Sequence, residues 1–112
     1  MRRWAVTALT GTALGAVAFG MPFAASGQST RSVLLEDIRF KPAKLTVRRG
    51  TLVTFRWRDA ATPHNVRSRG EPRFRGSGDR TRGTHEVRFR KAGTYRYVCT
   101  IHPGMSGRIV VR

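Results

Sequence analysis

The sequence of 112 residues predicts one small all-β domain, an antiparallel sandwich or barrel of short strands. Apolar and polar residues alternate with period two in several segments, Gly, Pro and Asp separate these segments, and no segment shows helical spacing of comparable strength. Arginines occupy many of the polar positions. Much of the basic charge is therefore expected on the solvent faces of strands.

The alternating segments run from residue 45 to the end of the chain. The positions predicted to face inward are Leu45 and Val47, then Val53, Phe55 and Trp57, then Val87 and Phe89, then Tyr95 and Tyr97, and last Ile109 and Val111. The least patterned segment, 67–83, is rich in Gly and Arg. It is predicted to be a long loop or a weak edge strand of the same domain, because neither flank could form a core alone.

The N-terminus is typical of an export signal. Two arginines near the start precede the uncharged apolar stretch 5–19, and the small residues at 24–27 suit cleavage. We expect a signal peptide at 1–26 and a single domain at 27–112, exported to the periplasm or the outer face of the cell envelope. The alternative is an uncleaved membrane anchor, but the apolar stretch is shorter than the roughly 20 residues that span a bilayer.

The charge of the chain is strongly positive, with 22 Lys and Arg against 6 Asp and Glu, a formal net charge of +16. Export argues against genomic DNA, so we expect no nucleic-acid partner. A basic surface should speed encounter with an acidic partner, or contact with an anionic membrane surface or envelope polymer, at a rate that falls as salt rises. The alternative is a basic surface that is only solvated.

The sulfur-containing side chains of the predicted domain lie in 99–105, Cys-Thr-Ile-His-Pro-Gly-Met. Cys99 is the single cysteine, which excludes an internal disulfide or a multi-thiolate zinc site. A thiolate, an imidazole and the thioether of Met105 suit copper better than zinc. One strong ligand is missing from this segment, and His64 can supply it. The predicted set is thus His64, Cys99 and His102 with Met105 as a weak axial ligand, the trigonal blue-copper arrangement.

Each of these residue types also has a structural interpretation, since a lone cysteine or methionine is usually core and a lone histidine usually satisfied within the fold. Their joint spacing favours copper. A Cys–His hydrolase is disfavoured because no base-orienting carboxylate lies near, so we predict no catalytic residue and no enzyme. His85, in Thr-His-Glu, has no partner at ligand spacing and is expected at the surface of a strand edge.

These residues resemble the cupredoxins of the plastocyanin and amicyanin group. The resemblance is carried by His64-Asn65-Val66, by 93–99 (Gly-Thr-Tyr-Arg-Tyr-Val-Cys) and by the Cys-x-x-His-x-x-Met spacing, and it covers about 33–112. The prolines before the first histidine and after the second are most similar to amicyanin. The resemblance implies a Greek-key β-sandwich with one type 1 copper ion at its end, passing single electrons between Cu(II) and Cu(I).

The resemblance also implies roles around the copper. Asn65 should hydrogen-bond Thr100, and its backbone amide should approach the sulfur of Cys99. The edge of the second histidine should be exposed through an apolar patch, which here could include Pro63, Pro103 and Gly104. Because Gly104 stands where amicyanins carry a bulky apolar residue, docking through a broad hydrophobic face is in doubt.

The implied function is that of a monomeric carrier between a redox donor and acceptor, such as a dehydrogenase and a c-type cytochrome or an oxidase, with an acidic docking face on the partner. Two other functions stay open. The same ligands could serve copper storage or delivery, although a closed site with a strong thiolate argues against easy release. The arginines could instead bind a polyanion beside a vestigial site, but the intact ligand set argues against this.

Overall fold

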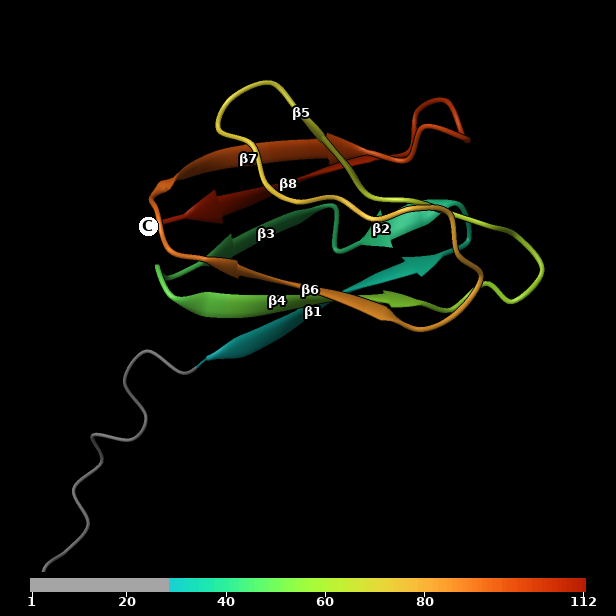
Figure 1. Cartoon of the computed structure of the whole chain (residues 1–112), viewed down its shortest axis with the longest axis horizontal. Coiled ribbons are helices and arrows are strands. Elements are labelled where there is room, and N and C mark those ends of the chain that lie inside the picture. The colour runs from blue at the N-terminus through green and yellow to red at the C-terminus, as the bar shows by residue number, and fades with distance from the viewer. Residues whose placement is uncertain (1–28) are drawn as a thin grey trace, which may run out of the picture.

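The computed structural model describes residues 29–112, so the signal peptide expected at 1–26 lies outside the described residues. Within this range the chain forms eight strands and no helix (Figure 1). The strands are β1 (Thr30–Glu36), β2 (Arg39–Lys41), β3 (Lys44–Val47), β4 (Thr51–Trp57), β5 (Arg67–Arg69), β6 (Thr84–Phe89), β7 (Gly93–Val98) and β8 (Ser106–Val111). The described part of the chain accordingly contains no helix able to cross a bilayer.

The strands form two four-stranded sheets, in the orders β2-β1-β4-β6 and β3-β8-β7-β5. The sheets face each other, and the chain passes from one to the other between β2 and β3, β3 and β4, β4 and β5, β5 and β6, and β6 and β7 (Figure 1). These crossings produce the predicted Greek-key β-sandwich. They also place the β4–β5 and β7–β8 loops at one end of the sandwich, with the C-terminus at the other (Figure 1).

Two pairs of strands differ from the antiparallel arrangement predicted from the sequence. β1 pairs with β4 in parallel, and β3 pairs with β8 in parallel. Period-two alternation describes the two faces of one strand and carries no information about the direction of its neighbour. No strand is predicted before residue 45, where the structure has β1, β2 and the start of β3.

The core lies between the sheets. All positions predicted to face inward are buried except Val87, which is half-buried and packs against the core. The segment 67–83 contributes the short edge strand β5 and a long loop, as predicted. This loop also brings Phe74 onto the core, where its ring centroid lies 5.3 Å from that of Phe89.

The prediction for His85 is wrong, because only 7% of this residue is exposed. His85 pairs with Phe55 across β6 and β4, and its Nε2 lies 2.8 Å from the carbonyl oxygen of Arg75 in the loop after β5. That loop supplies the polar partner that a buried imidazole requires. Thr-His-Glu contains no sign of a distant loop that would cover it.

The ring of Tyr97 on β7 lies over the backbone of Gly107 on β8. The two residues lie directly opposite each other, and a Cβ atom on Gly107 would lie 2.6 Å from the Tyr97 ring. The ring packs edge-on against Phe40 and Phe55, at centroid distances of 4.7 and 5.4 Å. The hydroxyl group has no hydrogen-bond partner among the described residues, and burial raises the pKa of Tyr97. The glycine therefore leaves the space that this ring fills.

Candidate metal centre

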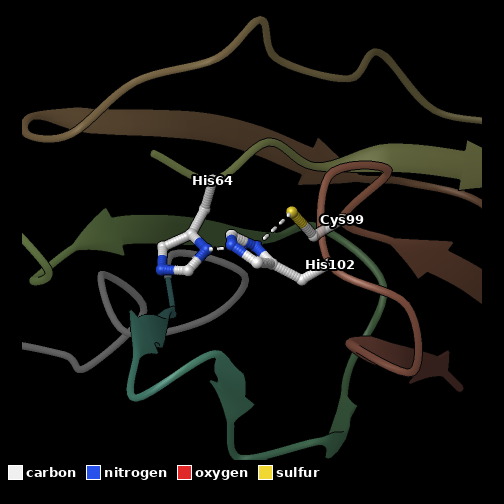
Figure 2. Close-up of side chains that lie close together, drawn as sticks. All are labelled: His64, Cys99 and His102. Carbon is white, nitrogen blue, oxygen red and sulfur yellow. Dashed lines mark hydrogen bonds between the residues drawn. The ribbon is translucent and has the colours of Figure 1, made fainter. Parts of the chain in front are cut away.

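Two loops bring the predicted ligands together at one end of the sandwich. His64 comes from the segment between β4 and β5, whereas Cys99 and His102 come from the loop between β7 and β8. Their side chains point toward one another in Figure 2. The strand pattern explains the position of Cys99, because Tyr95, Tyr97 and Cys99 alternate inward along the β7 direction and all three are buried.

The donor atoms are close enough to share one metal ion. His102 Nδ1 lies 3.3 Å from His64 Nδ1 and 3.5 Å from Cys99 Sγ. One ligand atom from each of the three residues, a ring nitrogen of each histidine and the cysteine sulfur, lies within 4.8 Å of the other two. Donors bound about 2.0–2.3 Å from a metal ion lie roughly 3–4 Å apart at tetrahedral or trigonal angles. Two imidazoles and a thiolate at these separations fit copper.

The site is shielded from solvent except at His102. The exposed fraction is 0% for His64, 3% for Cys99 and 2% for Met105, whereas His102 is half-buried. Met105 belongs to the same turn, since its backbone oxygen accepts from the Cys99 amide at 2.9 Å and its own amide donates to the His102 carbonyl at 3.1 Å. The turn thus folds the second histidine and the methionine back beside the cysteine.

Asp59 determines which nitrogen of His64 faces the other donors. Its Oδ2 lies 2.8 Å from His64 Nε2. A carboxylate can only accept a hydrogen bond, so Nε2 carries the proton and the Nδ1 lone pair is free for a metal ion. The hydrogen bond to His64 lowers the pKa of Asp59, as do the backbone amides of Ile38 and Asp37. Asp59 was not predicted, because its five-residue separation from His64 matches no ligand spacing, and the expectation that no base-orienting carboxylate lies near is wrong.

The backbone of His64 is held from two sides. Its amide donates to the Arg80 carbonyl at 2.9 Å, and its carbonyl accepts from the Arg80 amide at 3.0 Å and from Trp57 Nε1 at 2.8 Å. The Arg80 guanidinium also lies over the Trp57 ring, 5.3 Å from its centroid. These bonds fix the chain on which the first imidazole is carried.

Asn65 joins the two loops. Its Nδ2 donates to Thr100 Oγ1 at 2.8 Å, and the Thr100 amide donates to Asn65 Oδ1 at 2.9 Å. The Asn65 amide points to Cys99 Sγ at 3.5 Å, so both predicted contacts of this residue are present. Its Nδ2 also donates to Asp79 Oδ1 at 2.8 Å, a partner that the sequence analysis did not include. The cysteine sulfur therefore faces a fixed N–H donor.

The surface around the site contains the three residues of the predicted apolar patch. Pro63, Pro103 and Gly104 are all exposed. Ile101, in the same loop, is 38% exposed and adds a larger apolar side chain that the sequence analysis did not include. The residues that flank the half-buried His102 in the sequence are therefore exposed and apolar.

Comparison with known proteins identifies related sequences. A family model described as copper binding proteins, plastocyanin/azurin family, matches residues 28–112. Amicyanin-alpha of Methylorubrum extorquens is 34% identical over 84 residues, which cover 70% of this chain and 69% of that protein. Halocyanin of Natronomonas pharaonis is 39% identical over 77 residues, covering 64% of this chain and 47% of that protein.

Solved structures show the same fold. An oxidised amicyanin variant superposes with a TM-score of 0.63 at 31% identity, covering 72% of this chain and 80% of that chain. A purple cupredoxin from Nitrosopumilus maritimus superposes with a TM-score of 0.66 at 24% identity, covering 73% of this chain and 99% of that chain. The second likeness concerns the fold alone.

Proposed function

The chain belongs to the plastocyanin/azurin family of copper binding proteins, and from this premise we propose that it is an exported carrier of single electrons between redox proteins of the cell envelope. Its cofactor is one type 1 copper ion. When bound, copper supplies the Cu(II)/Cu(I) couple. The observation that carries the proposal is the convergence of one thiol and two imidazoles from separate loops within 4.8 Å.

The ligand set that we propose is His64, Cys99 and His102, with Met105 as a long axial ligand. The Nδ1 atoms of both histidines face the shared space, and Asp59 accepts a hydrogen bond from Nε2 on the opposite side of the His64 ring. The Asn65 amide stabilises negative charge on the Cys99 sulfur. Met105 is 2% exposed, so its thioether would meet a bound copper ion away from solvent.

The scaffold around the ligands suits electron transfer because it resists rearrangement. Cu(II) and Cu(I) prefer different geometries, so a site that holds its donors in an intermediate arrangement limits the movement that each transfer requires. The Asn65–Thr100 bonds hold the two loops together, and the Arg80 and Trp57 bonds hold His64. His64 and Cys99 are therefore held by bonds from residues outside the donor set.

We also propose the cellular setting. A signal peptide at 1–26 would deliver the domain at 27–112 to the periplasm or the outer face of the envelope, where a dehydrogenase and a c-type cytochrome or oxidase are suitable partners. The apolar residues beside His102 support a short path for electrons at that edge. The protein is proposed to act as a monomer without catalytic activity of its own.

The visible absorption and EPR spectra of the copper-loaded protein test the ligand set. We expect an intense blue colour in the oxidised state that bleaches reversibly with one electron per protein. Cys99→Ala should abolish the colour, because the absorption band that causes it requires the cysteine thiolate bound to copper. Met105→Leu should keep the colour and raise the reduction potential, because a weak donor to Cu(II) is removed.

Two results would contradict these assignments. An unchanged spectrum in Cys99→Ala would exclude the proposed ligands. A colourless Cu(I) complex that hands its metal to an apo-acceptor would favour storage or delivery, the second function for which the same residues are suited.

A further inference from the structure

Four cationic side chains form a single row across the sheet β3-β8-β7-β5. Lys44 pairs with Arg108, Arg108 with Arg96, and Arg96 with Arg69, so the row contains one cation from every strand. All four residues are exposed. Because paired residues of neighbouring strands point to the same side, all four lie on the outer face, with Cβ atoms about 5 Å apart.

Among the residues that the structure describes, no outward strand position of this sheet is Asp or Glu. Apart from the row, its outward positions within the strands are Thr46, Arg67, Thr94, Val98, Ser106 and Val110. None of the four cations forms an ion pair in residues 29–112. The other sheet differs, because its outer face carries Glu36, which pairs with Lys41, and also Glu86.

The row opposes the stability of the free domain. Like charges directly opposite each other on neighbouring strands are destabilising, and here three such contacts follow one another. No acidic side chain at the strand positions of this face, within 29–112, offsets the repulsion. An acidic surface placed over the row would remove it, which gives a negatively charged partner a specific gain at this position.

The row lies next to the candidate metal centre. One surface hollow is lined by all four cations, and a second is lined by Cys99, His102 and Met105 of the metal loop. The two hollows share the lining residues Arg69, Val98 and Ser106. A partner seated on the row would therefore reach the edge of the metal loop.

The chemistry of the face favours a protein partner over a lipid surface. Insertion into a bilayer interface needs exposed apolar side chains beside the cations. The two large hydrophobic side chains that are exposed in the described residues, Ile38 and Ile101, both lie outside this sheet. The four cations instead form a row at the spacing of neighbouring strands, which suits carboxylates held on a folded surface.

We propose that the outer face of the sheet β3-β8-β7-β5 docks an acidic region of a redox partner protein on the row Lys44, Arg108, Arg96 and Arg69. This inference rests on the proposed electron-carrier function for the redox character of the partner. The docking itself depends only on the row, so binding can be measured separately from the copper spectrum.

Titration of the ¹⁵N-labelled, copper-loaded, reduced protein with poly-L-glutamate tests the docking face by NMR. Amide shifts should concentrate on β7 and β8 and diminish as salt is added. The double variant Arg96→Gln/Arg108→Gln should weaken binding about tenfold, as expected for the loss of two exposed charge contacts. The matched control Arg39→Gln/Arg56→Gln removes the same charge from the other sheet and should change affinity less than about twofold.

Equal weakening by the two double variants would overturn the proposal, because net charge alone would then explain binding. It would also be overturned if vesicles of phosphatidylglycerol and phosphatidylcholine, but not polyglutamate, shifted the β7 and β8 amides. The blue band of each reoxidised sample is recorded in parallel. If the native protein shows no blue band, the proposed copper function is contradicted. The docking proposal is tested separately, by the NMR shifts.

Discussion

At the scale of single residues, Asp59 has the clearest effect on the chemistry of the site. It accepts a hydrogen bond from His64 Nε2, and it places a negative charge behind the first imidazole. The charge favours the more positive oxidation state of a bound metal ion, and the hydrogen bond fixes the ring. We therefore expect Asp59 to influence the reduction potential of a bound copper ion through His64.

Asp59→Asn should raise the reduction potential of the copper-loaded protein. The amide retains an acceptor for His64 Nε2 but removes the charge, and a loss of about 1 kcal/mol of Coulomb stabilisation corresponds to roughly 40 mV for one electron. Voltammetry of the native and variant proteins measures the change. Glu71→Gln, which removes an exposed charge from the loop after β5, serves as the control. Equal potentials in all three proteins would show that Asp59 has no electrostatic effect on copper.

The difference between the predicted and missed residues at this site has a physical cause. Cys99, His102 and Met105 are recognisable because one turn brings them together, so their spacing in the chain reflects their position in space. Asp59 contacts His64 through the folding of the β4–β5 loop, and that path leaves no fixed spacing. The same applies to Asp79, which reaches Asn65 from a loop 14 residues later in the chain.

At the scale of secondary-structure elements, the alternation of apolar and polar residues predicted the strands that have one face in the core and one face in solvent. β4 and β7 are easy to predict from the sequence because buried aromatic side chains alternate with polar ones. Strand neighbours were not predictable in the same way, and the parallel pairing of β1 with β4 depends on crossings between the sheets. Pattern gives the faces of a strand, whereas packing of the whole chain determines its partners.

The contact between β7 and β8 makes Gly107 sensitive to substitution. Gly107→Ala should lower the free energy of unfolding by about 1–3 kcal/mol, because the new Cβ would clash with the Tyr97 ring in a packed core. Urea unfolding of the two proteins measures the change.

Gly78→Ala is the matched control for this substitution, since a Cβ at Gly78 meets no atom within 4 Å. If both alanine variants unfolded at the same urea concentration, the ring of Tyr97 would not need the space at Gly107.

At the scale of the whole molecule, the metal centre connects distant parts of the chain. His64 and Cys99 are separated by 35 residues in the sequence (99 − 64), yet their donor atoms lie within 4.8 Å of each other. A metal ion bound at this point contacts both loops and therefore stabilises the folded chain over the unfolded one. Stability and copper occupancy should be linked.

Removal of copper should lower the unfolding temperature. A ligand at about 1,000 times its Kd stabilises the folded state by about 4 kcal/mol, which is roughly 15–30 °C for a domain of this size. Calorimetry of the copper-loaded and copper-free proteins gives the difference, and the same comparison for Cys99→Ala should show a much smaller one. Coincident transitions for the native protein with and without copper would contradict the linkage.

The row of cations on one sheet has a practical consequence for electrochemistry. A carboxylate-terminated electrode would adsorb the molecule through the face that carries Lys44, Arg108, Arg96 and Arg69. Adsorbed molecules would share one orientation, with the loop that carries His102 along the rim of the contact. On an amine-terminated film this orientation would be lost, so the two coatings should give different interfacial rates for the same protein.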